Sequence, residues 1–428
     1  MFEIALWGGQ FYYPKYRRIE SIKPILAELT AGQQVLKKTP KQGLIDLFDQ
    51  YSKNLLQNQR TNKIEGVAFL SSWLKSHNFM ALVEKNFKSI DYLDQFVGEK
   101  KRIKAQPRGI ACHWIAGNVP TLGIFSLLQS IFVGNINIMR IPPKSHPVMV
   151  DLLIAFSETE TISGISGKQV LESVGLLYYD KNFNIGNIEL SEIADVRIVW
   201  GGEEAVKSIS GIPKKSHTED IIFGPKYSFA VFDQASIKSE EFSRHLRFLV
   251  NDIYLFDQAA CTSPHVVFFE KNGKDISEIT AILKDIFIKQ SKRFPKTEID
   301  PYIMSKIINI RALYALDLDK QVICSDENDW TILINKDIVL EDPIESRTIF
   351  IKEIDSVMDV VPLITKKIQT IGCAIEDKAK LLQLADEVTY RGVSRCVNLG
   401  QMHLYDSPWD GFLTMAQLVN WVTLFYGD

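Results

Sequence analysis

One cysteine, Cys261, stands among small residues directly before a strongly apolar segment. Two alanines precede it, Thr-Ser-Pro-His follows it, and the apolar run 266–269 comes next. Small neighbours leave a thiol approachable, and a strand behind it holds the sulfur in one place, as a nucleophilic cysteine requires. A buried cysteine that only fills space at the start of a strand is the alternative, and it is the commoner fate of this residue type.

An asparagine occupies a second place where chemistry could occur. Residues 110–115 have the character of a strand, residues 122–132 that of a helix, and Asn118 lies in the turn between them. A side-chain amide near the start of a helix can donate to an oxyanion that develops during acyl transfer. It can equally cap the helix, and these residues alone leave both interpretations open.

The elements that must position these residues alternate along the chain. Helical spacing of apolar residues predicts helices between residues 19 and 87, with breaks at Asn78 and Ser89. From residue 109 onward, strands are predicted at 110–115, 136–140, 196–200, 229–232, 266–269, 330–334 and 348–351. Helices are predicted at 122–132, 148–156, 203–209, 240–251, 276–290, 357–368 and 378–387. Strands that alternate with helices indicate parallel sheets built from crossover units, and hence an α/β fold.

Composition limits the possible classes of protein. The chain has 428 residues, of which 46% are hydrophobic and 24% charged, and this predicts a globular protein of two or three domains. A net charge of −3 gives no basic surface for nucleic acid. The five cysteines are scattered, without a CxxC pair or a Cys/His cluster, which predicts reduced thiols in a cytoplasm and no metal site.

Neither a signal peptide nor a membrane span is expected. The first nine residues lack the basic region and the long apolar region of a signal peptide. Residues 109–139 contain no Asp, Glu, Lys or Arg, but polar side chains such as His113, Gln129 and Asn137 would be costly in lipid. A buried strand, helix and strand of a large α/β protein explains this stretch better.

The order of these motifs resembles that of the aldehyde dehydrogenase superfamily, across residues 105–400. The shared motifs are the Asn-x-Pro turn at 118–120, a basic residue with proline at 140–143, a strand–Gly–Gly–helix at 196–209, Phe-Gly-Pro-Lys at 223–226 and Gln-Ala-Ala-Cys at 258–261. Within the superfamily, the chain most resembles the LuxC-type acyl-CoA or acyl-protein reductases of bacterial bioluminescence operons. Segments 199–202, 261–268 and 407–411 carry this closer resemblance.

The resemblance implies a role for several positions. Cys261 matches the catalytic nucleophile, and Asn118 matches the asparagine that holds the oxyanion together with the backbone N–H of Cys261. Arg140 stands where dehydrogenases carry a lysine that binds the adenosine ribose of the cofactor. Gly201 and Gly202 match the turn beneath the cofactor phosphates, where a helix N-terminus attracts negative charge.

Three departures from the family pattern carry information. Val206 lies near the place of the second glycine of the phosphate-binding turn. Ile222 replaces the glutamate that activates water in hydrolytic aldehyde dehydrogenases, and a site without that base should hydrolyse its acyl-enzyme poorly. Pro143 stands where NAD-preferring members often carry an acid, whereas Arg140 and Lys144 could pair with a 2′-phosphate, which favours NADPH and leaves NADH possible.

Other candidates have simpler explanations. His265 could be a general acid, although on a strand its side chain can point away from the cysteine. His113 is expected to be a core residue whose ring nitrogens are hydrogen-bonded. His217 is another candidate proton donor. Glu341 and Glu345 lie near the place where a dehydrogenase glutamate contacts the nicotinamide ribose. Trp409 and Phe412 could cover an acyl tunnel or could simply pack against other residues.

We therefore expect an α/β protein with an aldehyde dehydrogenase-like fold, made of a Rossmann-type cofactor domain and an α/β catalytic domain. Residues 1–226 are expected to form an N-terminal helical cap with the dinucleotide-binding domain, and residues 227–398 the catalytic domain. Residues 399–428 are expected to form a tail that returns to the cofactor domain or to an oligomer interface. The likeness to this superfamily also implies a homo-oligomer.

The resemblance implies NADPH-dependent reduction of an acyl thioester to an aldehyde through an acyl-cysteine. The acyl donor would be acyl-CoA, an acyl-carrier protein or an acyl-protein synthetase. A hydrolytic aldehyde dehydrogenase is one alternative, and Ile222 disfavours it. A non-catalytic scaffold partner of an acyl-protein synthetase is the other, and it is disfavoured because Cys261 and Asn118 are both present.

Overall fold

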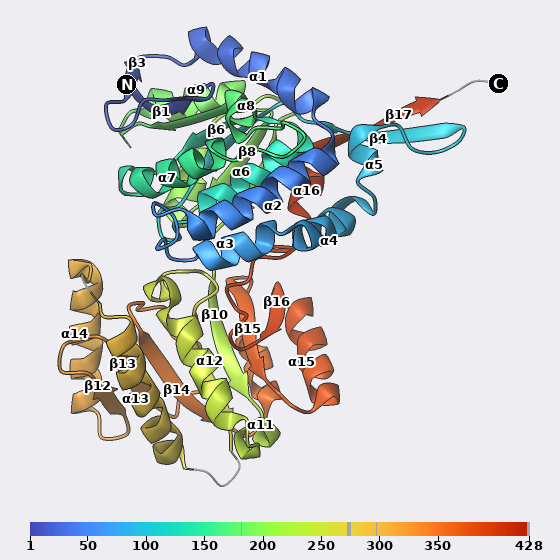
Figure 1. The fold of residues 1–428 in the computed structure, drawn as a ribbon. Coiled ribbons are helices and arrows are strands. Elements are labelled where there is room, and N and C mark those ends of the chain that lie inside the picture. Colours follow the sequence, from blue (N-terminus) through green and yellow to red (C-terminus); the bar gives the residue numbers. More distant parts are fainter. Residues whose placement is uncertain (181, 272–274, 297, 426–428) are drawn as a thin grey trace. The chain divides into compact units, whose positions relative to one another are not determined.

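The structure is a computed structural model that describes residues 1–180, 182–271, 275–296 and 298–425. The chain divides into two compact units (Figure 1). The first unit comprises residues 1–224 and 405–428, and the second comprises residues 225–404. The boundaries expected from the sequence lay after residues 226 and 398, and the last three residues of the expected tail, 426–428, lie outside the described residues.

A mostly parallel sheet forms the centre of the first unit. Its strand order is β2-β1-β7-β6-β5-β8-β9, with β3 paired to β1. Strands β7, β6, β5, β8 and β9 run parallel, whereas β1 pairs antiparallel with β7. The strands are β1 (Phe2–Trp7), β2 (Gln10–Phe11), β3 (Arg17–Ile19), β5 (Ile110–Trp114), β6 (Ile136–Arg140), β7 (Val174–Tyr178), β8 (Val196–Trp200) and β9 (Glu219–Phe223).

Helices cover both faces of this sheet. Apolar side chains of α2, α3, α4, α6 and α7 share a core with one face, and those of α9 and α10 share a core with the other. The helices are α1 (Leu26–Lys38), α2 (Lys41–Gln57), α3 (Val67–Leu74), α4 (Ser76–Phe87), α5 (Asp91–Asp94), α6 (Leu122–Val133), α7 (His146–Ser157), α8 (Gly167–Val170), α9 (Asn184–Ile193), α10 (Glu203–Ser210) and α16 (Thr414–Gln417).

The uncharged stretch 109–139 forms β5, α6 and β6 in the middle of this unit. Every residue of α6 after the first is buried, so this helix needs apolar side chains on all its sides. This placement confirms the expectation of a buried strand, helix and strand. In the part of the chain that the structure describes, no helix has the length and the apolar character to cross a membrane.

The second unit has its own mostly parallel sheet, with strand order β12-β13-β14-β11-β10-β15-β16. Only the pair β12–β13 is antiparallel among the pairs described in this sheet. Apolar residues of α12 and α13 pack on one face, and those of α14 and α15 on the other. The strands are β10 (Tyr227–Phe232), β11 (Pro264–Glu270), β12 (Gln321–Cys324), β13 (Thr331–Ile334), β14 (Thr348–Ile354), β15 (Ile368–Ala374) and β16 (Arg395–Asn398); the helices are α11 (Gln234–Lys238), α12 (Phe242–Tyr254), α13 (Ile276–Arg293), α14 (Pro301–Leu316) and α15 (Lys378–Tyr390).

Two sequence-based expectations about these elements are wrong, and the N-terminal strand was not expected. The helix expected at 357–368 is a 3-10 helix, Val357–Leu363, followed by the start of β15, because Pro362 lacks the N–H that would continue an α-helix. Asn78 does not break a helix, since it lies inside α4. The N-terminus contributes β1 to the sheet before the helices begin.

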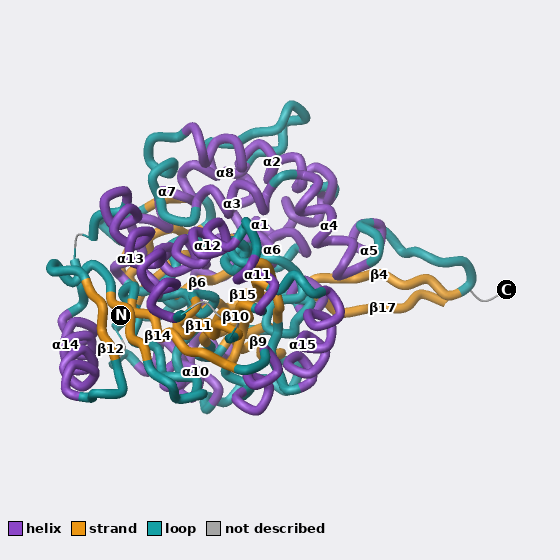
Figure 2. Tube along the Cα trace, turned by 90° about the horizontal axis from the view of Figure 1, so that it is seen from below, coloured by secondary structure: helices purple, strands orange, loops and turns teal. Residues whose placement is uncertain are grey.

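A two-stranded ribbon extends from the first unit (Figures 1 and 2). It consists of β4 (Lys101–Pro107) and β17 (Val419–Phe425), which pair antiparallel from Pro107–Val419 to Lys101–Phe425. The chain from residue 405 onward therefore returns to the first unit, where its last strand pairs with a segment more than three hundred residues earlier.

Candidate active site

Asn118 and the residues expected to bind the cofactor lie at one edge of the first unit's sheet. Asn118 follows β5, Arg140 ends β6, and Gly201 and Gly202 follow β8. These strands are parallel neighbours in the order β6-β5-β8, so their carboxyl ends meet at the same edge. The chain runs from β5 to β6 and β7 on one side and then crosses from β7 to β8 on the other side of β5. A crevice at such a switch point is where open α/β sheets bind ligands.

Arg140 and Lys144 both present cationic groups near this edge. The Arg140 guanidinium lies 5.6 Å from the ring centroids of both Tyr178 and Tyr179. Lys144 is exposed in the turn after β6, and its side chain passes Gly117, where an added Cβ would lie 3.0 Å from the Lys144 Cε. The turns after β5 and β6 therefore contact each other, and glycine permits that close approach.

The turn after β8 is less suited to a phosphate group than the resemblance implies. Gly202 precedes α10 as its N-cap residue, in extended backbone, and nothing lies within 4 Å of the place of its missing Cβ. Two exposed carboxylates, Glu203 and Glu204, occupy the first turn of α10. They already complement the positive end of the helix dipole and would repel an anion. Val206, at the expected place of the second glycine, lies within α10.

Asn118 is exposed and lies three residues before Thr121, the N-cap residue of α6. The Thr121 side chain makes no capping hydrogen bond. Asn118 is therefore not the N-cap residue of this helix, and its oxyanion role stays a prediction. Asn118 belongs to the first unit and Cys261 to the second.

Cys261 precedes the amino end of β11 and lies beside the amino end of β10, the neighbouring strand of the second unit. It is partly exposed, and it belongs to the cysteine segment, residues 255–263, which links α12 to β11. The hydroxyl of Ser228, at the start of β10, donates to the backbone carbonyl oxygen of Cys261 at 2.7 Å. Anchoring of the backbone next to the sulfur satisfies the requirement for a fixed nucleophile.

The cysteine segment has a strained backbone. Phe256, Asp257 and Gln258 have φ angles of 56°, 49° and 66°, in the left-handed region that side chains with a Cβ rarely adopt. Gln258 is buried and holds this conformation by donating to the carbonyl oxygens of Pro264 and Thr348, at 2.8 and 2.9 Å. The side-chain amide oxygen of Gln258, Oε1, accepts from the backbone N–H of Thr348 at 2.8 Å. Local strain that the surroundings stabilise in this way is typical of functional sites.

A second left-handed turn, residues 345–347, contacts the first. Its φ angles are 72°, 57° and 62°. The Ser346 N–H donates to the Asp257 carbonyl oxygen at 3.0 Å, and Arg347 Nε lies 2.8 Å from Asp257 Oδ1. Arg347 is buried and stacks over the ring of Tyr254 at 4.3 Å. Burial raises the pKa of Glu345, the first residue of this turn, above its usual value.

The other four thiols have different surroundings. Cys112 and Cys373 are buried, and burial raises the pKa of Cys112 well above its usual value. Cys396 is partly exposed beside Cys373, and the hydrogen bond between these two thiols raises the pKa of Cys373. Cys324 is exposed on β12. Exposure alone therefore does not distinguish Cys261, whereas the strained and anchored segment does.

The three histidines singled out from the sequence have different surroundings. His113 is buried and bonds with Ser126 and Asn137, at 2.9 and 3.0 Å, which confirms it as a satisfied core residue. His265 is buried inside β11, and burial lowers its pKa to about 3. His217 is exposed just before β9, 3.3 Å from Asp195, and so lies at the amino edge of its sheet, away from Asn118.

The tail aromatic residues pack against their own unit. Trp409 stacks on Tyr405 with ring centroids 4.4 Å apart, and Tyr405 stacks on Phe125 at 4.8 Å. Phe412 contacts the edge of Phe223 at 5.7 Å. These contacts favour the packing interpretation of the pair over an acyl-tunnel cover.

Ile222 lies on β9 with its side chain partly exposed.

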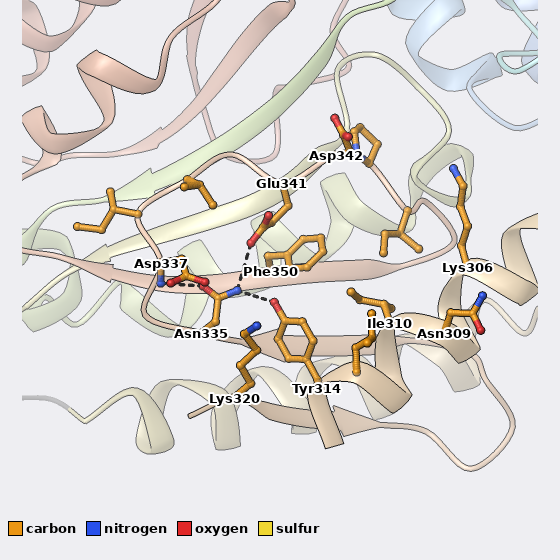
Figure 3. Close-up of a pocket in the computed structure, with 15 residues that line it drawn as sticks. Lys306, Asn309, Ile310, Tyr314, Lys320, Asn335, Asp337, Glu341, Asp342 and Phe350 are labelled. Carbon is orange, nitrogen blue, oxygen red and sulfur yellow. Dashed lines mark hydrogen bonds between the residues drawn. The ribbon is translucent and has the colours of Figure 1, made fainter. Parts of the chain in front are cut away.

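A cavity of about 850 Å³ opens in the second unit beside α14 (Figure 3). On its lining, the carboxylate of Glu341 lies 3.2 Å from Asn335 Nδ2 and 2.8 Å from the Nζ of the buried Lys352. Burial lowers the pKa of Lys352, and Glu341 opposes this shift. The Glu341 carboxylate is thus occupied by a lysine of its own unit, and the nicotinamide-ribose role expected for it stays a prediction.

Sequence reasoning missed several residues that hold the cysteine segment, namely Ser228, Gln258, Arg347 and His403, whose Nδ1 lies 2.8 Å from the hydroxyl of Thr262. Only Gln258 lay within a recognised motif, and no role followed from it. Among the described residues, no group of three or more His, Cys, Asp or Glu side chains could hold a metal ion.

Comparison with known protein families decides the class of this chain. Residues 34–421 match the acyl-CoA reductase (LuxC) family. The chain belongs to this family. Similar curated proteins are a long-chain acyl-protein thioester reductase 2 of Photobacterium leiognathi, 24% identical over 92% of this chain and 80% of its own length, and a long-chain acyl-protein thioester reductase of Vibrio harveyi, 26% identical over 75% of this chain. The match covers 65% of the length of the Vibrio harveyi protein and of its Aliivibrio fischeri counterpart, a little under two thirds.

Solved structures confirm the fold of this LuxC-family chain. An aldehyde dehydrogenase of Brucella melitensis superposes with a TM-score of 0.69 at 10% identity, covering 100% of this chain and 95% of its own. An NADP-dependent glyceraldehyde-3-phosphate dehydrogenase of Bacillus halodurans, complexed with NADP, superposes with a TM-score of 0.68 at 12% identity, covering 99% of both chains. The expected aldehyde dehydrogenase-like α/β fold is therefore confirmed.

Proposed function

We propose that this chain reduces a long-chain acyl thioester to an aldehyde, with Cys261 as the nucleophile. The setting of Cys261 carries the proposal, because a partly exposed thiol lies in an anchored, strained segment of a LuxC-family chain. Similar proteins named long-chain acyl-protein thioester reductases support an acyl group carried by a protein as the substrate, with acyl-CoA as the other donor.

The roles of the chain's own residues follow from acyl-transfer chemistry. The Cys261 thiolate attacks the thioester carbonyl, the acyl group passes to its sulfur, and the carrier leaves as a thiol after taking up one proton. The Asn118 amide and the Cys261 N–H donate to the oxyanion of this step. When the aldehyde leaves, the bond between carbon and the Cys261 sulfur breaks and the thiolate returns.

A nicotinamide cofactor supplies the hydride for this reduction when it is bound. Arg140 and Lys144 support binding of the adenosine half of such a cofactor at the carboxyl edge of the first unit's sheet, because both provide cations there. A 2′-phosphate would pair with these cations, which favours NADPH. Glu203 and Glu204, in the first turn of α10, would repel the cofactor phosphates. Gly201 and Gly202 would therefore contact the phosphates only where these two carboxylates are not close to them.

Hydrolysis is the competing outcome at such a cysteine, and Ile222 disfavours it. Water attack on an acyl-cysteine needs a base within hydrogen-bond reach. The family position of that base holds Ile222, whose side chain cannot accept a proton. The acyl-enzyme should therefore survive until it is reduced.

Acylation can be tested directly by mass spectrometry. Incubation with a long-chain acyl-CoA should add one acyl group to the peptide that contains Cys261, and Cys261→Ser should remove it. Cys324→Ser is the matched control, because Cys324 is the exposed thiol on β12 and its loss should leave acylation unchanged. Acyl label on Cys324 or Cys396, with none on Cys261, would refute the assignment.

A further inference from the structure

His403, a buried residue of the second unit, contacts the cysteine segment near both of its ends. Its Nδ1 lies 2.8 Å from the hydroxyl of Thr262, the residue that follows Cys261. Its ring packs edge-on against Phe256, with ring centroids 5.5 Å apart. Its Nε2 lies 2.7 Å from the backbone carbonyl oxygen of Asp252, near the end of α12. One side chain therefore connects the helix before the segment with the residue after the cysteine.

These partners determine which ring nitrogen carries the proton. The carbonyl oxygen of Asp252 can only accept, so Nε2 of His403 donates to it. In the neutral ring Nδ1 is then an acceptor, and the Thr262 hydroxyl donates to it. Burial lowers the pKa of His403 to about 4, which keeps the ring neutral near pH 7.

Asp252 also fixes the stretch of chain that carries His403. Its carboxylate accepts from the backbone N–H of Gly400 at 2.6 Å, three residues before the histidine. The Asp252 side chain is 3% exposed, so this bond is shielded from water. Asp252 thus holds the chain three residues before His403, and the ring of His403 is held at both of its nitrogens. The ring can therefore act as a rigid support.

We propose that His403 is a positioning residue that acts through Thr262 to hold Cys261 in the geometry needed for attack on the acyl carbonyl. This inference rests on the proposed function of Cys261. Ser228 holds the carbonyl oxygen of Cys261, and His403 holds the side chain of the next residue, so the backbone is anchored on the carboxyl side of the sulfur-bearing residue. Misplacement of a reacting atom by about 1 Å can lower a rate by about a hundredfold.

The first test compares two substitutions of Thr262. Thr262→Val removes the hydroxyl and keeps the shape, whereas Thr262→Ser keeps the hydroxyl. We expect Thr262→Val to lower kcat by about tenfold to a hundredfold with KM within about twofold, and Thr262→Ser to retain most of the turnover. Thr389→Val is the matched control, because the hydroxyl of this exposed threonine donates to carbonyl oxygens of α15 itself and its loss should leave kcat unchanged.

The second test replaces the support itself. His403→Phe keeps a ring to pack on Phe256 but removes both hydrogen bonds, so its effect on kcat should resemble that of Thr262→Val. Combining the two substitutions should lower kcat little further than either alone, because both break the same contact. Independent, multiplying losses in the double variant would overturn the proposal.

Hydrogen exchange of the cysteine segment separates this inference from the function it rests on. Thr262→Val and His403→Phe should each speed amide exchange in residues 255–263 by about tenfold, the scale of one lost hydrogen bond, and Thr262→Ser should not. If the wild type reduces no acyl thioester while this pattern holds, the proposed function fails and the support by His403 stands. Equal exchange and equal kcat in Thr262→Val and Thr262→Ser would overturn the positioning role.

Discussion

Truncation of the Gln258 side chain should destabilise the cysteine segment more than substitution of any exposed residue of the second unit. In Gln258→Ala, the carbonyl oxygens of Pro264 and Thr348 each lose a buried donor. The Thr348 N–H loses its bond at 2.8 Å but keeps the Glu345 carbonyl oxygen at 3.2 Å, so its loss is partly compensated. At about 1–3 kcal/mol for each buried group left without a partner, the variant should lose about 2–5 kcal/mol.

Amide exchange is the suitable assay, because a chain of two compact units need not unfold in one step. A loss of about 2–5 kcal/mol corresponds to exchange faster by about thirtyfold to several thousandfold in the peptides of β11 and β14. Gln290→Ala is the control, since Gln290 bonds to Asn251 at the surface and its loss should change stability by less than about 0.5 kcal/mol. A change below about 1 kcal/mol in Gln258→Ala would refute the reasoning about the cysteine segment.

Three further predictions follow from the same observations. Asn118→Ala should lower turnover by about a hundredfold to a thousandfold in steady-state assays, with the melting temperature nearly unchanged because Asn118 is exposed and is not the N-cap residue of α6; full turnover would exclude its oxyanion role. Arg140→Ala should weaken NADPH binding in a fluorescence titration and spare NADH, and an equal loss for both would contradict a 2′-phosphate contact. Stability measured by urea unfolding should fall as the pH is lowered from about 6.5 to about 4. In this range the histidines of the unfolded chain take up protons, whereas the buried histidines of the folded chain stay neutral. Constant stability over this range would contradict their burial. The histidines whose pKa is lowered by burial are His113, His146, His265 and His403.

The parallel strands that carry the candidate site were predictable from the sequence. Short apolar runs bounded by turn residues located β5, β6, β8 and β11 to within a few residues, and the motif order identified the fold. Strands without that pattern were missed. The polar residues of β9 read as a turn-rich stretch, and β1 precedes the first recognisable helix.

The contacts that support Cys261 were not predictable, because they join residues far apart in the chain. Thr262 meets His403 across 141 positions, and Gln258 meets Thr348 across 90. The left-handed backbone at residues 256–258 and 345–347 left no signal either, since none of these residues is glycine. Such conformations are imposed by tertiary contacts rather than by local propensity.

The fate of acylated Cys261 tests the central claim most directly. Enzyme acylated with a long-chain acyl-CoA and freed of excess reagent should keep its acyl group for a long time without cofactor, because Ile222 supplies no base for water attack. Addition of NADPH should then release the chain as aldehyde, with one cofactor oxidised for each acyl group lost. Rapid release of free acid before any cofactor is added, or no aldehyde after its addition, would contradict the account of this chain as an acyl thioester reductase.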